Sequence, residues 1–227
     1  WSDGSTANFD IYHKKSTDGG TTWSAIKRLT WNSGESRHPA IAVDSNDNLH
    51  VVWHDSSTGN WEIFYKLSTD GGTTWSGLKR LTWNSGLSQH PGITIDSNNH
   101  LHVVWQDNTS GNWEIYYKKS TNGGTTWSTP TRLTWNPGNS WHQKIEADSN
   151  NHLHVVWYDK TSGNWEIYYK KSTNAGTSWS ALTRLTWNSG ESNYPSIAAD
   201  SLNHVHVAWY DNTPYNQEIY YKKWNKP

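Results

Sequence analysis

Aromatic, imidazole and carboxylate side chains recur along this chain at a fixed interval of 52 residues. The clearest set comprises Trp31, His38, Asp55 and Trp61. Flat aromatic rings stack on the C–H face of a sugar, and short polar side chains exchange hydrogen bonds with its hydroxyl groups. Brought to one surface, these residue types would suit the binding of carbohydrate.

The set returns in the later copies with changes at a few positions. The residue before the histidine varies most, and the histidine itself becomes Tyr194 in the last copy. Such variation fits either neutral drift on an exposed surface or a binding face that is diversified. The candidate ligand-binding residues are Trp31, Arg37, His38, Asp55, Trp61, Trp83, Gln89, His90, Asp107, Trp113, Trp135, Trp141, His142, Asp159, Trp165, Trp187, Asn193 and Tyr194.

A structural role is the alternative for many of these residues. Asp55 and its copies could cap loops, and Trp31 and its copies could serve packing. A metal held jointly by His38, His90 and His142 is disfavoured by Tyr194 in the fourth copy, so no metal or cofactor is expected. Two further sets lie within or at the end of strands, and we expect them to be structural: Trp53, Trp105, Trp157 and Trp209, and His50, His102, His154 and His206.

Acidic residues give no sign of a catalytic pair. Glycoside hydrolysis requires two carboxyl groups about 5–10 Å apart. One series, Glu62, Glu114, Glu166 and Glu218, places each member in a different repeat, and Glu35, Glu146 and Glu191 form no evident pair. We therefore assign no catalytic residue.

The elements that must position these side chains are short strands. Within one unit, residues 39–44, 49–53, 61–66 and 78–82 are apolar or alternating runs separated by turn residues. No segment has a helical period. Four antiparallel strands in a repeat of this length indicate one blade of a β-propeller. A β-sandwich is the alternative, but it does not require a 52-residue internal repeat.

One motif in each repeat carries a family resemblance. Ser16 to Trp23 reads STDGGTTW, and close variants begin at Ser68, Ser120 and Ser172. The motif resembles the Asp box of sialidase-type (BNR-repeat) propellers. The resemblance implies a hairpin between the third and fourth strands of a blade, with Asp18 bonded to the turn and Trp23 packed between strands. It also implies that ligands bind at the opposite end of the blade.

The resemblance does not extend to sialidase activity. A sialidase needs an arginine cluster, because the substrate carboxylate is held by guanidinium groups. This chain has five arginines, and the family's Arg-Ile-Pro string is absent. Only Arg37 departs from the repeat at the ligand-binding end; the other four are periodic and are expected to be structural: Arg28, Arg80, Arg132 and Arg184.

Counting strands predicts four Asp-box blades in a single domain over residues 1–227. We expect residues 195–223 to form the closing blade with the N-terminal strand near residues 26–30. One third-type strand is then surplus, because residues 9–15 and 217–223 compete for one place. An unpaired strand is a template for association, so the termini could mediate homo-oligomers.

Composition limits the function classes. The 18 Trp and 12 Tyr can build a core, and the net charge of −1 with evenly spread Lys and Arg disfavours nucleic acid. No apolar run approaches the ~20 residues of a membrane span. We expect a non-catalytic, multivalent, lectin-like propeller that binds glycans or polysaccharide and is secreted or extracellular. The alternatives are an assembly protein that exchanges terminal strands and a fragment of a larger sialidase-like protein.

Overall fold

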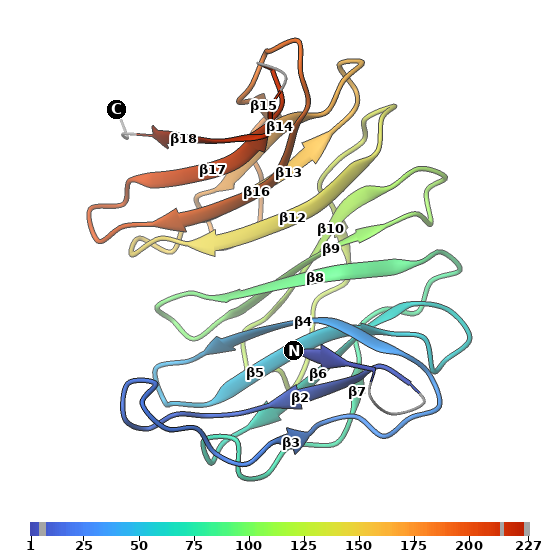
Figure 1. Cartoon of the computed structure of the whole chain (residues 1–227), viewed down its shortest axis with the longest axis vertical. Helices are drawn as coiled ribbons and strands as arrows, with labels where there is room; N and C mark the ends of the chain where they lie inside the picture. Colours follow the sequence, from blue (N-terminus) through green and yellow to red (C-terminus); the bar gives the residue numbers. More distant parts are fainter. Residues whose placement is uncertain (5–7, 214–215, 225–227) are drawn as a thin grey trace. The chain divides into compact units, whose positions relative to one another are not determined.

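The computed structural model describes residues 1–4, 8–213 and 216–224, and this part of the chain is all-β without helices. Figure 1 shows the strands running in antiparallel succession within each repeat. The first strands are β4 (Ser36–Val43), β8 (Ser88–Ile95), β12 (Ser140–Ala147) and β16 (Ser192–Ala199), and the second are β1 (Ser2–Asp3), β5 (Leu49–Asp55), β9 (Leu101–Asp107), β13 (Leu153–Asp159) and β17 (Val205–Asp211). The third are β2 (Asp10–His13), β6 (Glu62–Ser68), β10 (Glu114–Ser120), β14 (Glu166–Ser172) and β18 (Glu218–Trp224), and the fourth are β3 (Lys27–Arg28), β7 (Lys79–Arg80), β11 (Thr131–Arg132) and β15 (Thr183–Arg184).

These strands form five antiparallel sheets in the described ranges. Three sheets are complete blades of four strands, β4–β7, β8–β11 and β12–β15. The other two have three strands each, β1–β3 and β16–β18. The Asp box joins the third strand to the fourth in four of the sheets, so the predicted all-β fold with Asp-box blades of a β-propeller is confirmed.

The predicted pairing at the chain ends is wrong. We expected the N-terminal fourth strand to complete the sheet of residues 195–223, but β3 pairs with β2, and β2 with β1. In the next repeat, Asp55 at the end of the second strand lies opposite Glu62 at the start of the third strand. Asp3 lies opposite Asp10 in the same way, so β1 corresponds to the end of a second strand. The two third-type strands therefore do not compete, because β2 and β18 each stay in a three-stranded sheet.

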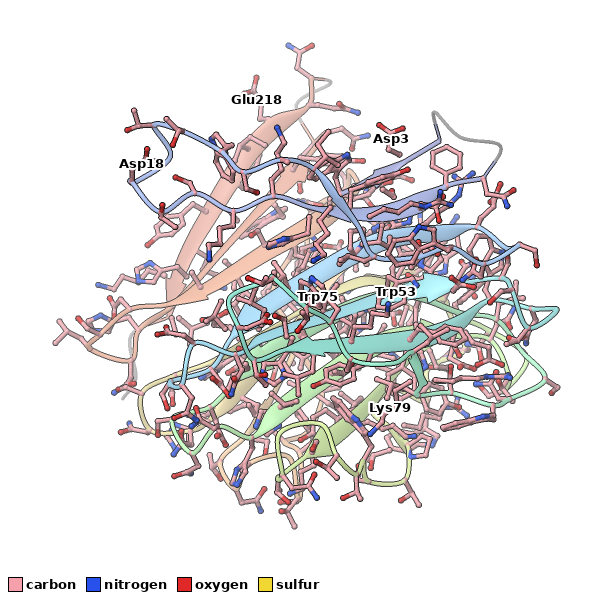
Figure 2. All side chains as sticks on the ribbon, turned by 90° about the horizontal axis from the view of Figure 1, so that it is seen from below. Asp3, Asp18, Trp53, Trp75, Lys79 and Glu218 are labelled. Atoms are coloured by element: carbon pink, nitrogen blue, oxygen red, sulfur yellow. The ribbon has the colours of Figure 1, made fainter. Side chains whose placement is uncertain are left out.

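The chain divides into two compact units, Trp1–Pro91 and Gly92–Pro227, each with its own core. In the first unit, Ile11, Leu29 and Phe64 pack around the fully buried Trp53, which is labelled in Figure 2. In the second unit, buried clusters surround Trp157 and Trp209. Burying an indole contributes about 4–6 kcal/mol at ~25 cal/mol per Å². The predicted core role of the second-strand tryptophans is confirmed, whereas a single domain over residues 1–227 stays a prediction.

The second-strand histidines are structural, as predicted. His50 is buried, with Nδ1 2.8 Å from the Tyr65 hydroxyl and Nε2 3.5 Å from the Asp44 carboxylate. His102 makes the same two contacts in the next repeat. Burial lowers the pKa of both imidazoles, so they are neutral partners of the tyrosines.

The Asp-box hairpins have the predicted turn chemistry. The Asp70 carboxylate accepts hydrogen bonds from the backbone N–H and the hydroxyl of Thr74, which lower the pKa of Asp70 to about 2. Figure 2 shows Asp18 on the equivalent hairpin. Trp23 corrects the expectation of packing, because it is 59% exposed. Trp75, in contrast, packs edge-on against His13 of the preceding sheet. Trp23 belongs to the first described sheet, β1–β3, and therefore has no such neighbour among the described residues.

Candidate functional site

A β-bulge at the start of the first strands sets the geometry of the candidate site. The register shifts between Arg37 and Ala40 in β4, and equivalent shifts occur in β12 and β16. Bulges of this kind redirect side chains and are common beside functional sites. The bulged residue has a positive φ although it is not glycine, a strained conformation that typically costs about 1–3 kcal/mol. These residues are His38, His90, His142 and Tyr194, with φ between 47° and 53°.

In the first unit, three histidine rings gather at the bulge. The His38 ring lies 4.1 Å from the His90 ring and 5.0 Å from the His54 ring, measured between centroids. Trp61 meets His54 edge-on at 4.8 Å. The backbone N–H of His90 donates to Nδ1 of His54 at 3.0 Å, which places the proton of the neutral ring on Nε2. Burial, and then the neighbouring His90, His38 and Arg37, lower the pKa of His54 to about 2.

In the second unit, the equivalent positions form an aromatic cluster. Trp141 stacks on Trp165 at 4.9 Å, and Tyr158 meets Trp165 edge-on at 5.0 Å. His142 stacks on Tyr158 at 5.4 Å and lies 4.5 Å from Tyr194. Burial and the nearby tyrosines raise the pKa of Tyr158, so its hydroxyl stays protonated. The structure thus brings together most of the predicted histidine, tyrosine and second-loop tryptophan residues within each unit.

The sequence did not lead us to one repeat position that contributes to these clusters, the position of His54, Gln106, Tyr158 and Tyr210. His54 and Tyr158 lie at the centre of their clusters, and Gln106 accepts the backbone N–H of His142 at 3.1 Å as His54 does from His90. The signal was present in the sequence. In each repeat this position lies between a Trp and an Asp that do not vary. The position itself varies: it is His54, then Gln106, and then tyrosine in the last two repeats, Tyr158 and Tyr210.

Asp55, Asp107 and Asp159 do not face a ligand, in contrast to their selection as candidates. Asp55 is fully buried and accepts hydrogen bonds from the Ser36 hydroxyl at 2.5 Å and from the Asn32 amide at 2.6 Å. It also accepts the Trp53 indole N–H at 3.3 Å. Asp107 and Asp159 are equally buried and bind the equivalent indole. These carboxylates close the loops around the site through hydrogen bonds to backbone and side-chain groups of the protein.

Four exposed indoles each precede an asparagine in the sequence, and three of these asparagines, Asn32, Asn136 and Asn188, donate a hydrogen bond to the buried aspartate. We call Trp31, Trp83, Trp135 and Trp187 the outer tryptophans; they are 65–67% exposed. The Arg28 guanidinium lies 5.9 Å from the Trp31 ring, and the Lys66 ammonium lies 5.5 Å from it. A pocket of about 240 Å³ opens beside this indole, between Leu29, Lys66 and Leu78.

The remaining candidates are placed less favourably for a ligand. Arg37 lies 3.8 Å over the Phe9 ring and binds Glu35 at 3.0 Å. Gln89 and Trp113 are half-buried, and Asn193 is buried. The four periodic arginines are structural, as predicted, because each binds a buried carboxylate at 2.6–2.7 Å, those of Asp10, Glu62, Glu114 and Glu166.

No group of three or more His, Cys, Asp or Glu side chains in the described ranges is arranged to hold a metal ion. The described residues also contain no helix able to span a membrane. The end of the sheets that carries the bulges presents aromatic rings, imidazoles, amides and a few cations. This chemistry suits sugars.

Residues 2–207 match the model of the BNR repeat-like domain. The chain belongs to this family. No curated protein matches it. The assignment agrees with the Asp-box hairpins and with the predicted sialidase-like propeller fold.

Solved structures with a similar fold include an arabinofuranosidase, an arabinanase and a sialidase. The α-L-arabinofuranosidase of Fusarium graminearum with arabinobiose is 16% identical, with a TM-score of 0.67, 85% of this chain covered and 63% of that one. The α-L-arabinanase of Penicillium chrysogenum with arabinobiose is 14% identical, with a TM-score of 0.67 and the same coverage. A Hadza microbial sialidase is 12% identical, with a TM-score of 0.67, 88% of this chain covered and 48% of that one. The chain thus spans about half to two thirds of their lengths, and at this identity the likeness shows the fold alone.

Proposed function

We propose that this protein is a non-catalytic, multivalent carbohydrate-binding protein. The observation that carries the proposal is the exposure of the outer tryptophans, which are 65–67% exposed in all four repeats. Leaving an indole in water forgoes several kcal/mol of burial, and packing gives no reason to repeat that loss four times. A sugar face covering each indole would recover part of this free energy.

The other side chains at this end of the sheets support binding rather than hydrolysis. Most of the repeated carboxylates that could act as acid and nucleophile are buried, either against arginine, as Glu62 is, or inside the loop network, as Asp55 is; Glu218 is exposed. Repeated sites on a rigid scaffold gain avidity on a polymer or a glycan-covered surface, although each site alone is weak. An extracellular or secreted location belongs to this proposal, because polysaccharides are presented there.

The test is a titration with a panel of soluble polysaccharides that includes arabinan and sialylated glycans. Binding would be followed by calorimetry and by tryptophan fluorescence, and product analysis would report any cleavage. We expect saturable binding without cleavage, and a loss of at least tenfold in affinity when all four outer tryptophans are replaced by alanine. Trp23→Ala is the matched control, because Trp23 is also exposed but lies on an Asp-box hairpin. Cleavage, or unchanged affinity in the fourfold variant, would contradict the proposal.

A second candidate function is self-assembly, and β18 favours it. Among the described strands, β18 pairs with β17 alone, and Ile219 and Tyr221 are 77% and 60% exposed. The equivalent Ile63 and Tyr65 are buried. A free strand edge can accept a strand from a second copy. Light scattering without sugar would then show oligomers that Ile219→Lys disrupts, whereas a monomer at high concentration would dismiss this candidate.

A further inference from the structure

We propose that the outer tryptophans bind sugar residues that carry an anionic group, a uronate carboxylate or a sulfate. This inference rests on the proposed function and names its ligand class. It concerns the junction between one sheet and the next, where the indole and a lysine ammonium meet beside a pocket. The histidine and aromatic clusters at the bulges have no part in it.

The cations around Trp31 differ in how their charges are balanced. Arg28 binds the buried Asp10 carboxylate at 2.6 Å, so its charge is neutralised inside the protein. Lys66 instead donates to the Leu29 carbonyl at 2.8 Å while its ammonium lies 5.5 Å from the Trp31 ring. The salt bridges found among the described residues include none at Lys66. The Trp31 junction therefore keeps the Lys66 charge beside an exposed aromatic ring.

The same arrangement occurs in the second unit. The Lys170 ammonium lies 5.4 Å from the Trp135 ring, and the Lys222 ammonium lies 5.7 Å from the Trp187 ring. In both cases the arginine of the tryptophan's own sheet, Arg132 or Arg184, lies at 5.8–5.9 Å. Recurrence in three junctions shows that the pairing of indole and ammonium belongs to the repeat unit.

The environment of the lysines favours an incoming anion. Lys66 and Lys170 are half-buried, and burial lowers the pKa of each ammonium because water is partly removed from the charge. An anion bound beside the ammonium would replace the lost solvation. The pocket beside Trp31, of about 240 Å³, has the volume of roughly eight waters at ~30 Å³ each, which is room for one sugar ring.

The two parts of the site divide the recognition of such a ring. The indole offers a flat apolar face to the C–H side of the sugar. The ammonium is a compact point charge that accepts carboxylate or sulfate without demanding bidentate geometry. A neutral sugar would use the indole alone and would bind more weakly. Affinity for the acidic ligand should also fall with salt, as for any exposed ion pair.

The experiment compares polygalacturonate with its fully methyl-esterified form, which has the same backbone without the charge. Dextran sulfate and dextran form a second pair, which distinguishes sulfate from carboxylate as the preferred group. We expect at least tenfold tighter binding of the acidic member of one pair at low salt. The triple variant Lys66→Gln, Lys170→Gln and Lys222→Gln should remove that preference and leave binding of the neutral member within twofold.

Two control proteins make the result specific. Replacing the same three lysines by arginine keeps the charge and should keep most of the preference. Replacing Lys14, Lys15 and Lys144 by glutamine removes three charges away from the outer tryptophans and should leave the preference intact. Equal binding of acidic and neutral members, or equal losses in both glutamine variants, would overturn the inference but leave the proposed function standing. Binding of neither member, nor of any polysaccharide in the wider panel, would overturn both.

Discussion

His54 gives a prediction that can be worked through from the structure. Its imidazole is 2% exposed and accepts the backbone N–H of His90 through Nδ1 at 3.0 Å. At the equivalent position of a later repeat, Gln106 accepts the same type of hydrogen bond through Oε1. The substitution His54→Gln therefore keeps the hydrogen-bond acceptor and removes the titratable group, because glutamine already fills this role at Gln106.

The magnitude follows from proton linkage. Burial, and then the neighbouring His90, His38 and Arg37, lower the pKa of folded His54 to about 2, while the unfolded chain protonates histidine near ~6.5. The unfolded state therefore binds the extra proton first as the pH falls. The free energy of unfolding is unaffected by this group above about 6.5 and decreases by ~1.4 kcal/mol per unit below it. Between pH 7 and pH 5, His54 should cost about 2 kcal/mol, and any folded pKa well below 5 gives the same result.

The assay is urea denaturation of the wild-type chain and of His54→Gln at pH 7 and pH 5, followed by tryptophan fluorescence. Other buried histidines with lowered pKa values, such as His50 and His102, titrate in both proteins and cancel in the comparison. We expect the wild type to lose about 2 kcal/mol more than the variant over this range. Equal losses in the two proteins would show that folded His54 takes up a proton near its ordinary pKa, and would refute the geometry assigned to it.

Two further predictions compare matched pairs of side chains in the same denaturation assay. Arg80→Ala leaves the buried Glu62 carboxylate without its counter-ion and should cost about 3–5 kcal/mol, whereas Arg37→Ala, at a half-exposed ion pair, should cost less than about 1 kcal/mol. Similar costs for both would contradict the structural role given to the periodic arginines. Tyr65→Phe removes the partner of a buried histidine and should cost about 1–3 kcal/mol, but Tyr221→Phe, at the exposed copy, should cost less than about 0.5 kcal/mol.

The blade could be predicted because its determinants are local. Alternating apolar runs mark the strands, and the Asp box carries its own hydrogen-bonding partners within a few residues, as Asp70 and Thr74 show. The pairing of the ends could not be predicted. Residues 10–15 read DIYHKK and residues 218–223 read EIYYKK, so pattern alone cannot assign their neighbours. The decision lies with Trp1 to Asp3, a fragment of strand too short to recognise, whose Trp1 ring stacks on Tyr12 at 5.9 Å.

The candidate site shows a second limit of reading a repeat. Asp55 and Trp31 recur with the same regularity, yet Asp55 is buried in a hydrogen-bond network and Trp31 is exposed. Regular recurrence means that each blade needs the residue, and it does not distinguish closing a loop from meeting a ligand. Departures from the repeat were more informative about the bulge clusters. There, the position of His54 and Gln106 changes between repeats, while the Trp before it and the Asp after it do not.

The surroundings of the outer tryptophans Trp31, Trp135 and Trp187 are formed by residues of two consecutive repeats. Trp31 is followed in sequence by its own loop, but the ammonium beside it comes from Lys66 on the third strand of the next blade. A sequence pattern within one repeat contains neither that distance nor the missing carboxylate partner. Trp53 and Trp31 are both periodic indoles, and only the packing of sheet against sheet buries the first and leaves the second in solvent. The residues best placed to meet a ligand are therefore those whose surroundings are formed by two repeats together, and loss of the lysine should weaken binding of acidic polymers alone, whereas loss of the tryptophan should weaken binding of acidic and neutral polymers alike.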